Sequence, residues 1–160
     1  MRIEFRLNPR ARRGKLLTGK GSAGTPVHAG AFLKQRRITL DEALLEDAPE
    51  LLRILTHELF HFVWRRLDNL TRRDWERLLA AEKTSKDLGW SAEKRREQLT
   101  VNDVQRRTKA WRGYCCEAFA DTAAWVFSPG GHEEFSLPAV WKRHRRAWFL
   151  ALMKQRDLAL

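Results

Sequence analysis

PELLRILTHELFHFVWRRL, residues 49–67, carries apolar side chains on nearly every face of a helix, as a helix in the middle of a domain does. Asp47 precedes it with Glu50 three residues later, and Pro49 falls in the first turn, so the helix is predicted to start there. Two histidines and a glutamate nevertheless lie inside it, in LTHELFH at residues 55–61. Burying such polar groups costs free energy unless a cation or hydrogen bonds compensate them.

The spacing of His57 and His61 predicts a metal site. Positions i and i+4 of a helix face the same way, so the two imidazoles can chelate one cation. Glu58 lies about 100° further around the axis, near enough to reach a water on that cation. A chain of this composition contains such an HExxH pattern by chance only about once in a hundred cases. The alternative is a pair of core histidines bound to the backbone or to a carboxylate.

A second helix, predicted over residues 111–127, supplies two acids in the apolar context YCCEAFADTAAW. Catalytic zinc takes three protein ligands and one water, and the third histidine of metzincins is excluded because its position holds Leu67. Glu117 is therefore predicted to bind the metal. Asp121, at i+4 on the same face, is predicted to accept the second ring N–H of a ligand histidine. Alternatively, both acids pair with Arg112 or another arginine.

HELFH followed downstream by EAFAD resembles the gluzincin (thermolysin-like) zinc metallopeptidases, in a minimal single-domain bacterial-type form. The Glu-x-x-x-Asp signature is the specific part of this resemblance. The ligands that it implies for one Zn²⁺ are His57, His61 and Glu117. It further implies that Glu58 is the general base and acid for a zinc-activated water that hydrolyses peptide bonds, and that Asp121 supports a ligand histidine.

The resemblance does not assign the group that stabilises the oxyanion. The family supplies a His or Tyr from outside the two motifs, and the chain lacks the large C-terminal helical subdomain of typical members. The candidates in this sequence are Tyr114, His132 and His144. A structural role is the alternative for each of them.

The resemblance covers residues 27–132 and also implies where substrate binds. In gluzincins the strand before the motif helix is an edge strand that pairs with the extended backbone of the substrate. By that analogy, residues 27–33 line the cleft. The residues predicted to bind substrate are Val27, His28, Ala29 and Gly30.

The remaining patterns predict an α+β fold, mostly helical and zincin-like, with a small antiparallel or mixed N-terminal sheet packed on the motif helices. The alternating RIEFRL (2–7) predicts an edge strand, and VHAGAFLKQRRITL (27–40) predicts a strand or a hairpin. Between them, a Gly- and Arg-rich segment (12–26) is predicted to be a mobile loop. Peripheral helical pieces and a C-terminal helix are predicted at residues 72–83, 91–99 and 138–158.

Length and composition favour one cytoplasmic, monomeric domain over residues 1–160, with a mobile basic segment at residues 1–25. No apolar run approaches the roughly 20 residues needed to cross a bilayer. The N-terminus also lacks the apolar part of a secretory signal. Neighbouring Cys115 and Cys116 would form a strained, uncommon disulfide, so we expect free thiols packed like small hydrophobes.

The net charge of +11 makes nucleic acid a candidate partner. The basic residues are spread over most of the chain without a nucleic-acid-binding motif, which favours a solvated basic surface. The function predicted first is hydrolysis of a peptide or protein substrate. The alternatives are a zinc-stabilised nucleic-acid-binding protein without hydrolytic activity, and a latent peptidase whose residues 1–25 or C-terminal helix cover the cleft.

Overall fold

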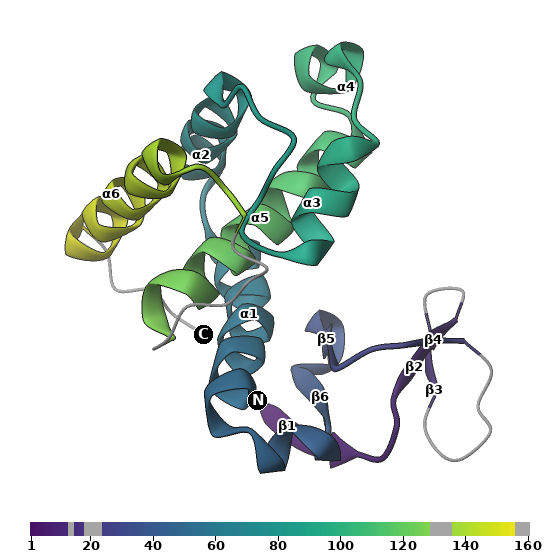
Figure 1. The fold of residues 1–160 in the computed structure, drawn as a ribbon. Helices are drawn as coiled ribbons and strands as arrows, with labels where there is room; N and C mark the ends of the chain where they lie inside the picture. The colour runs from purple at the N-terminus through teal and green to yellow at the C-terminus, as the bar shows by residue number, and fades with distance from the viewer. Residues whose placement is uncertain (13–14, 18–23, 129–135, 156–160) are drawn as a thin grey trace.

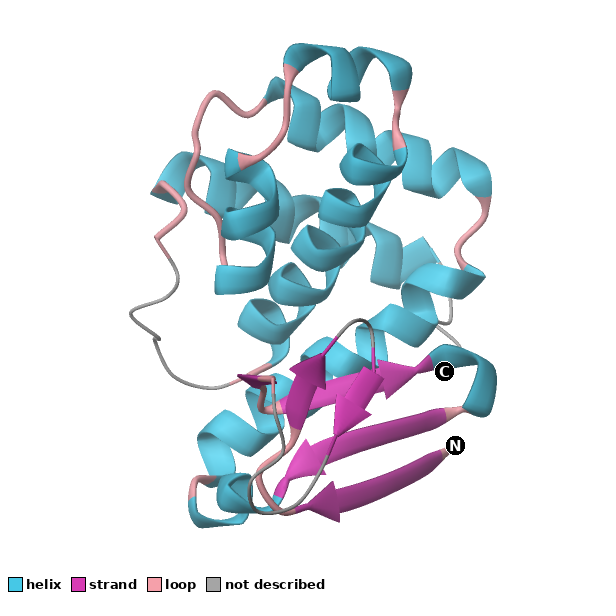
Figure 2. Cartoon of the chain, turned by 90° about the vertical axis from the view of Figure 1, so that its right-hand side faces the viewer, coloured by secondary structure: helices cyan, strands magenta, loops and turns pink. Residues whose placement is uncertain are grey.

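The computed structural model describes residues 1–12, 15–17, 24–128 and 136–155, with the strands at one end and helices α2–α6 at the other (Figures 1 and 2). The strands come first along the chain: β1 (Arg2–Arg6), β2 (Arg10–Arg12), β3 (Lys15–Leu17), β4 (Thr25–Pro26), β5 (Ala29–Phe32) and β6 (Arg37–Asp41). The helices follow: α1 (Ala48–Arg66), α2 (Asn69–Ala81), α3 (Trp90–Glu97), α4 (Val101–Arg106), α5 (Lys109–Phe127) and α6 (Ala139–Gln155). The predicted α+β, mostly helical class is confirmed.

The first sheet has the strand order β1-β6-β5 and is mixed. β1 runs parallel to β6, with Ile3 opposite Ile38, and forms an edge as predicted. β5 and β6 form an antiparallel hairpin joined by a 3-10 turn (Leu33–Gln35), after which Arg36 adopts a left-handed φ of 48°. β5 is the other edge of this sheet, so within the described part of the chain its outer side is open to an added strand.

The segment predicted as a mobile loop contains strands instead. β2 pairs antiparallel with both β3 and β4, so that Ala11 lies opposite Leu16 on one side and Thr25 on the other. Local composition missed this small sheet because its strands are stabilised by pairing with each other and not by strong β propensity. Residues 13–14 and 18–23 of the predicted loop lie outside the described residues.

α1 begins where the sequence predicts. Asp47 Oδ1 accepts a hydrogen bond from the Glu50 amide at 3.1 Å, and Pro49 lies in the first turn. Arg65 and Arg66 occupy the last turn, where cations favour the helix dipole. One side of α1 contacts β5 and β6 and the other contacts α5, so the helix lies between the sheet and the helical half. This position explains its lack of a wide polar face.

α5 is the second central helix and closely matches the predicted residues 111–127. Thr108 Oγ1 accepts a hydrogen bond from the Trp111 amide at 3.4 Å at its start. Phe119 on this helix is fully buried and packs against Phe149 of α6, with ring centroids 4.8 Å apart. The C-terminal helix therefore covers the helical core, as its amphipathic pattern indicates.

The segment between the two central helices is less peripheral than predicted. Trp75 and Leu79 of α2 are buried in the helical core, and the Trp75 indole N–H donates to the Cys115 carbonyl oxygen at 3.0 Å. α4 has no counterpart among the predicted helices, although Thr100 and Asp103 form a capping box at its start.

In the described part of the chain, none of the helices combines the length and the apolar character needed to cross a membrane. Both cysteines are free thiols, as predicted, with Cys115 buried and Cys116 half-buried. The prediction of free thiols is thus confirmed. The prediction that both pack like small hydrophobes holds less well for Cys116, because its thiol contacts the polar ring of His61.

Candidate metal centre

Three predicted ligands meet where α1 packs on α5. The His57 and His61 Nε2 atoms are 3.1 Å apart, and Glu117 Oε2 lies 3.5 Å from the first and 3.7 Å from the second. Zinc that binds tetrahedrally at about 2.0–2.1 Å holds its ligand atoms about 3.3 Å from one another. The observed triangle fits that requirement. Within the described ranges, it is the one group of three His, Cys, Asp or Glu side chains close enough to hold a metal ion.

The electrostatics of the triangle favour a bound cation. Burial, together with the charges of His57 and Arg95, lowers the pKa of His61 to about 4, so near neutral pH the ring is neutral and one of its nitrogens has a free lone pair. Burial alone would raise the pKa of Glu117, but the hydrogen bond with His57 and the nearby positive charges hold it at about 2. An ionised carboxylate and ring nitrogens therefore converge on one point, and a metal ion satisfies all of them at once.

Asp121 contacts the ring nitrogen of His57 that faces away from the triangle, which is the contact predicted for it. Its Oδ1 lies 2.7 Å from His57 Nδ1, so the ring donates its Nδ1–H and leaves Nε2 to face the metal position. Burial lowers the pKa of His57, but the charge of Asp121 and the hydrogen bond to it outweigh burial and raise this pKa above its ordinary value.

The backbone of Gly89, just before α3, lies directly over the Asp121 carboxylate. A Cβ built at position 89 would lie 2.5 Å from both carboxylate oxygens, closer than real side chains approach. The φ of Gly89 is −161°, which any residue can adopt, so the need for glycine here is steric and not conformational. Gly89 thus lets the chain pass directly over the carboxylate that pairs with His57.

We therefore expect Gly89→Ala to displace Asp121 and, for a zinc ion held by the triangle, to weaken binding by about 10- to 100-fold, as disruption of a ligand's supporting hydrogen bond does. Competition with a fluorescent chelator measures this affinity. Gly30→Ala is the matched control, because its added Cβ meets only two side-chain atoms at 3.9 and 4.0 Å. Equal zinc affinities for both variants and the parent protein would contradict this role of Gly89.

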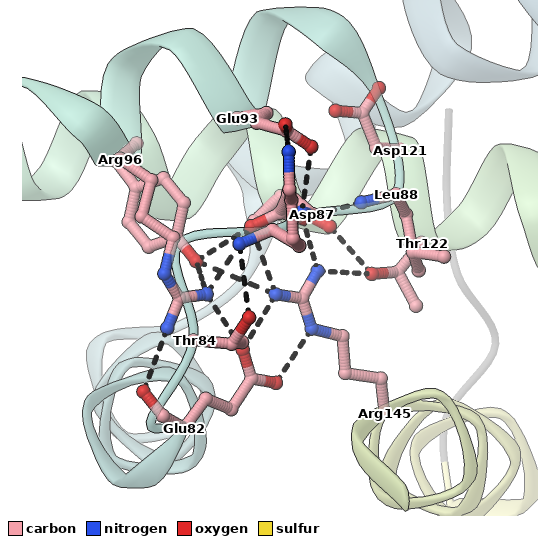
Figure 3. Close-up of polar contacts among 12 residues, drawn as sticks. Glu82, Thr84, Asp87, Leu88, Glu93, Arg96, Asp121, Thr122 and Arg145 are labelled. Carbon is pink, nitrogen blue, oxygen red and sulfur yellow. Dashed lines mark hydrogen bonds and ion pairs between the residues drawn. The ribbon is translucent and has the colours of Figure 1, made fainter. Parts of the chain in front are cut away.

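A buried ion network fixes the segment that carries Gly89 (Figure 3). Arg145 of α6 donates from Nε and Nη2 to Glu82 at 2.8 and 2.7 Å, and from Nη1 and Nη2 to Asp87 at 2.6 and 3.1 Å. All three side chains are 0% exposed. Arg96 of α3 adds a bond to Glu82 at 2.8 Å. The network lies outside the metal triangle and anchors its covering segment to two helices.

Arg145 corrects the prediction of a solvated basic surface. The prediction of a solvated surface for the basic residues includes those of WKRHRR (141–146), yet Arg145 in this segment is fully buried. The signal was present in the helix periodicity, because Trp141, Arg145, Phe149 and Leu152 recur at helical spacing on one face.

Glu58 follows His57 on α1 and accepts a hydrogen bond from the Ala31 backbone of β5. It is 8% exposed, and burial together with the Glu117 charge raises its pKa to about 7, although His57 and a hydrogen bond from the Ala31 backbone lower it. A cation held by the triangle would lower this pKa and favour the ionised form. Glu58 thus lies beside His57 in a buried position, and its predicted role as a general base stays a prediction.

A cavity of about 390 Å³ opens beside His57 and Glu58. Of the residues predicted to bind substrate, Val27, His28 and Ala29 line this cavity, whereas Gly30 does not. Its other walls include Thr25 and Pro26 of β4, Arg53 and Ile54 of α1, and the Gly89–Ser91 segment. The side chain of Trp90 in that segment is 62% exposed. The edge strand, the motif helix and the start of α3 therefore share one opening.

The alternative of an arginine partner is met in part for Glu117. Its Oε1 pairs with Arg95 Nη2 at 3.1 Å, while Oε2 faces the histidines. Arg112, the arginine named for that alternative, donates instead to the Arg107 carbonyl oxygen. One contact was not predicted: His61 Nδ1 lies 3.3 Å from Cys116 Sγ, so this thiol takes the supporting place that Asp121 takes for His57. Cys116 was missed because no motif specifies it.

The described candidates for the oxyanion group do not reach the metal triangle. Tyr114 is fully buried, and its hydroxyl donates to Asp87 at 2.9 Å within the ion network, so its role is structural. His144 is exposed on α6 and packs edge-on against Trp141, with ring centroids 5.4 Å apart. Neither lines the cavity beside Glu58. His132 lies outside the described residues, so its role stays a prediction.

The hypothesis of a latent peptidase names two segments that could cover the cleft, residues 1–25 and the C-terminal helix, and the structure places the second of them elsewhere. α6 packs through Phe149 and Leu152 into the helical core, and no residue of it lines the cavity beside Glu58. From the N-terminal side, Thr25 and Pro26 do line this cavity.

No protein-family model matches the chain, and no curated protein or solved structure matches it either. The functional argument therefore rests on the geometry of the site.

Proposed function

We propose that this protein is a zinc-dependent metallopeptidase with a minimal zincin-like fold of the gluzincin type. The single observation that carries the proposal is the triangle of His57, His61 and Glu117 ligand atoms, all within 3.7 Å of each other, beside the buried carboxyl of Glu58. The Glu-x-x-x-Asp spacing of α5 supports it, because Asp121 contacts a ligand histidine as that signature requires.

When bound, zinc supplies a Lewis acid that polarises a carbonyl oxygen and lowers the pKa of water. Glu58 accepts the proton of the attacking water and returns it to the leaving amine. Asp121 keeps His57 in the tautomer that presents Nε2, and Cys116 contacts the corresponding nitrogen of His61. The half-buried site limits water access, which strengthens these electrostatic interactions.

The outer side of β5 is suited to hold the substrate backbone. The His28 carbonyl accepts from the Asp41 amide at 2.8 Å, so His28, Gly30 and Phe32 form the hydrogen-bonded pairs with β6. By alternation, Ala29 and Ala31 direct their backbone groups outward. The Ala31 backbone hydrogen-bonds to Glu58, and the remaining groups are available to an extended peptide next to the general base.

The proposal predicts about one zinc per chain in protein purified without added metal. Elemental analysis measures the metal, and an unfolding curve recorded with and without a chelator measures the stabilisation that binding to the folded state confers. His61→Ala is expected to lose the metal, whereas His144→Ala, which alters an exposed histidine far from the triangle, is expected to retain it. Protein that contains no zinc and takes up none on titration would refute the proposal.

A further inference from the structure

A second cavity, of about 590 Å³, lies between the turn of the β5–β6 hairpin and the C-terminal end of α1. Its floor is apolar, formed by Phe32, Leu33 and Phe62. Around this floor lie four cationic side chains, and we call the whole the basic pocket. The cations are Lys34, Arg36, Arg65 and Arg66. Among the residues that the structure describes, no acidic one lines the pocket.

The cations of the basic pocket are exposed and have no carboxylate partner among the described residues. This distinguishes them from the arginines elsewhere in the fold that pair with acids, such as Arg37 with Glu4 at 2.9 Å and Arg107 with Glu76. Two of the four come from the turn of the β5–β6 hairpin and two from the end of α1. A concave site with several uncompensated positive charges attracts an anionic group.

The basic pocket is aligned with the catalytic cavity along α1. With 100° per residue, Glu58, His61 and Arg65 fall within about 60° of one another around the helix axis, so they share one stripe. Glu58 lines the first cavity and Arg65 lines the basic pocket. β5 follows the same course, because Ala29 lines the first cavity and Phe32 lines the second.

The spacing corresponds to a few residues of extended peptide. Glu58 and Arg65 are seven residues apart, which is about 10 Å along a helix. An extended chain advances about 3.3 Å per residue. A peptide paired with the outer side of β5 and cleaved beside Glu58 therefore brings its third or fourth residue from the cleaved bond to the basic pocket.

We propose that the basic pocket is a substrate subsite that selects an aspartate or glutamate three or four residues from the cleaved peptide bond. This inference rests on the proposed peptidase function and adds the substrate class, acidic peptides. The carboxylate meets the exposed cations, and the apolar floor contacts the methylene groups of the same side chain. The attraction also steers acidic substrates toward a chain of net charge +11.

Paired fluorogenic peptides test the inference with the zinc-loaded protein. Each pair is identical except for Asp or Asn at the third or fourth position, placed on either side of the expected cleavage site. At low salt we expect kcat/KM to be about tenfold higher for the Asp peptide at one of these positions, since several exposed pairs each contribute a modest factor. The ratio is expected to fall as salt rises, because screening weakens exposed charge pairs.

The double variant Arg65→Gln, Arg66→Gln removes two of the four cations and is expected to lower the Asp/Asn ratio from about ten to about three. The matched control is Arg143→Gln, Arg146→Gln, which removes the same charge from the exposed side of α6 and is expected to keep the ratio. A ratio of one at every position in the parent protein, with the Asn peptides cleaved, overturns the inference and leaves the peptidase function standing. If the zinc-loaded protein cleaves none of the peptides, the peptidase function itself fails.

Nucleic acid is the competing ligand for the same charges. A single-stranded oligonucleotide that binds at low salt, loses affinity in the Arg65→Gln, Arg66→Gln variant and not in the α6 control, and leaves the Asp/Asn ratio at one would assign the basic pocket to phosphate. That outcome also overturns the inference.

Discussion

Replacing Glu58 by glutamine is expected to lower kcat/KM for peptide cleavage by about 10²- to 10⁴-fold, the contribution of a positioned general base. Glutamine is nearly isosteric with glutamate and cannot accept the proton of the attacking water. Zinc content is expected to remain at one per chain, because the three ligands belong to other residues. Elemental analysis and peptide kinetics on the same preparation separate the two effects.

Glu46→Gln is the control for that substitution, since it makes the same change at an exposed glutamate shortly before α1. It is expected to cleave peptides at the parental rate. A Glu58→Gln protein that retains zinc and full activity would show that Glu58 is not the base. Loss of both zinc and activity would instead show that Glu58 is needed to assemble the site.

Replacing Arg145 by methionine is expected to lower the free energy of unfolding by about 3–5 kcal/mol, the typical cost of removing one partner of a buried ion pair. The substitution leaves the buried carboxylates of Glu82 and Asp87, both 0% exposed, without the cation that pairs with both of them. Urea unfolding of the metal-free proteins measures the change. Arg146→Met alters the neighbouring exposed arginine and is expected to stay within about 0.5 kcal/mol of the parent. Equal stability of Arg145→Met and the parent would contradict the network's role.

The same network predicts how stability depends on pH. Burial raises the pKa of Asp87, but the charge of Arg145 and its hydrogen bonds outweigh burial and hold the pKa below the ordinary 3.8. A carboxyl with a lowered folded-state pKa contributes stability above its unfolded-state pKa, and this stability is lost as the pH falls through the folded-state pKa. Without Arg145 the pKa of Asp87 rises, so Arg145→Met is expected to unfold at a higher pH than the parent during acid titration.

The central part of the site was predictable from sequence because helix geometry fixes which side chains share a face. The i, i+4 spacing places His57 and His61 on one face, and the same spacing aligns Glu117 with Asp121. The prediction that the two helices meet needed one further argument. Buried acids on one helix and buried imidazoles on the other offset the cost of each other's burial. Both halves of this reasoning used local patterns, and the structure brings the four side chains together.

The supporting residues depend on contacts between distant segments, which local patterns do not specify. Gly89 lies in a turn that resembles any other in sequence, and only the position of Asp121 beneath it requires a glycine. Cys116 became a partner of His61 through the packing of α5 on α1. Tyr114 illustrates the reverse error: it lies one turn before Glu117 in sequence, but its side chain points to the ion network.

The sheets also divide into parts that local patterns predict and parts that depend on pairing between strands. The β5–β6 hairpin and the β1 edge follow from alternation, whereas β2, β3 and β4 pair in a segment whose glycines and arginines indicated a loop. In the helical half, the helical spacing of Trp141, Phe149 and Leu152 marks the apolar face of α6. The burial of Arg145 on that face could not be predicted from this spacing, because an arginine on an apolar face is buried only when acids from another segment meet it.

A crystal of the zinc-loaded protein, measured at energies on either side of the zinc absorption edge, gives the most direct test. The anomalous difference map is expected to contain one strong peak between α1 and α5, within bonding distance of His57 Nε2, His61 Nε2 and Glu117 Oε2. A map without a peak at that position, or with zinc bound by other side chains, would contradict the account.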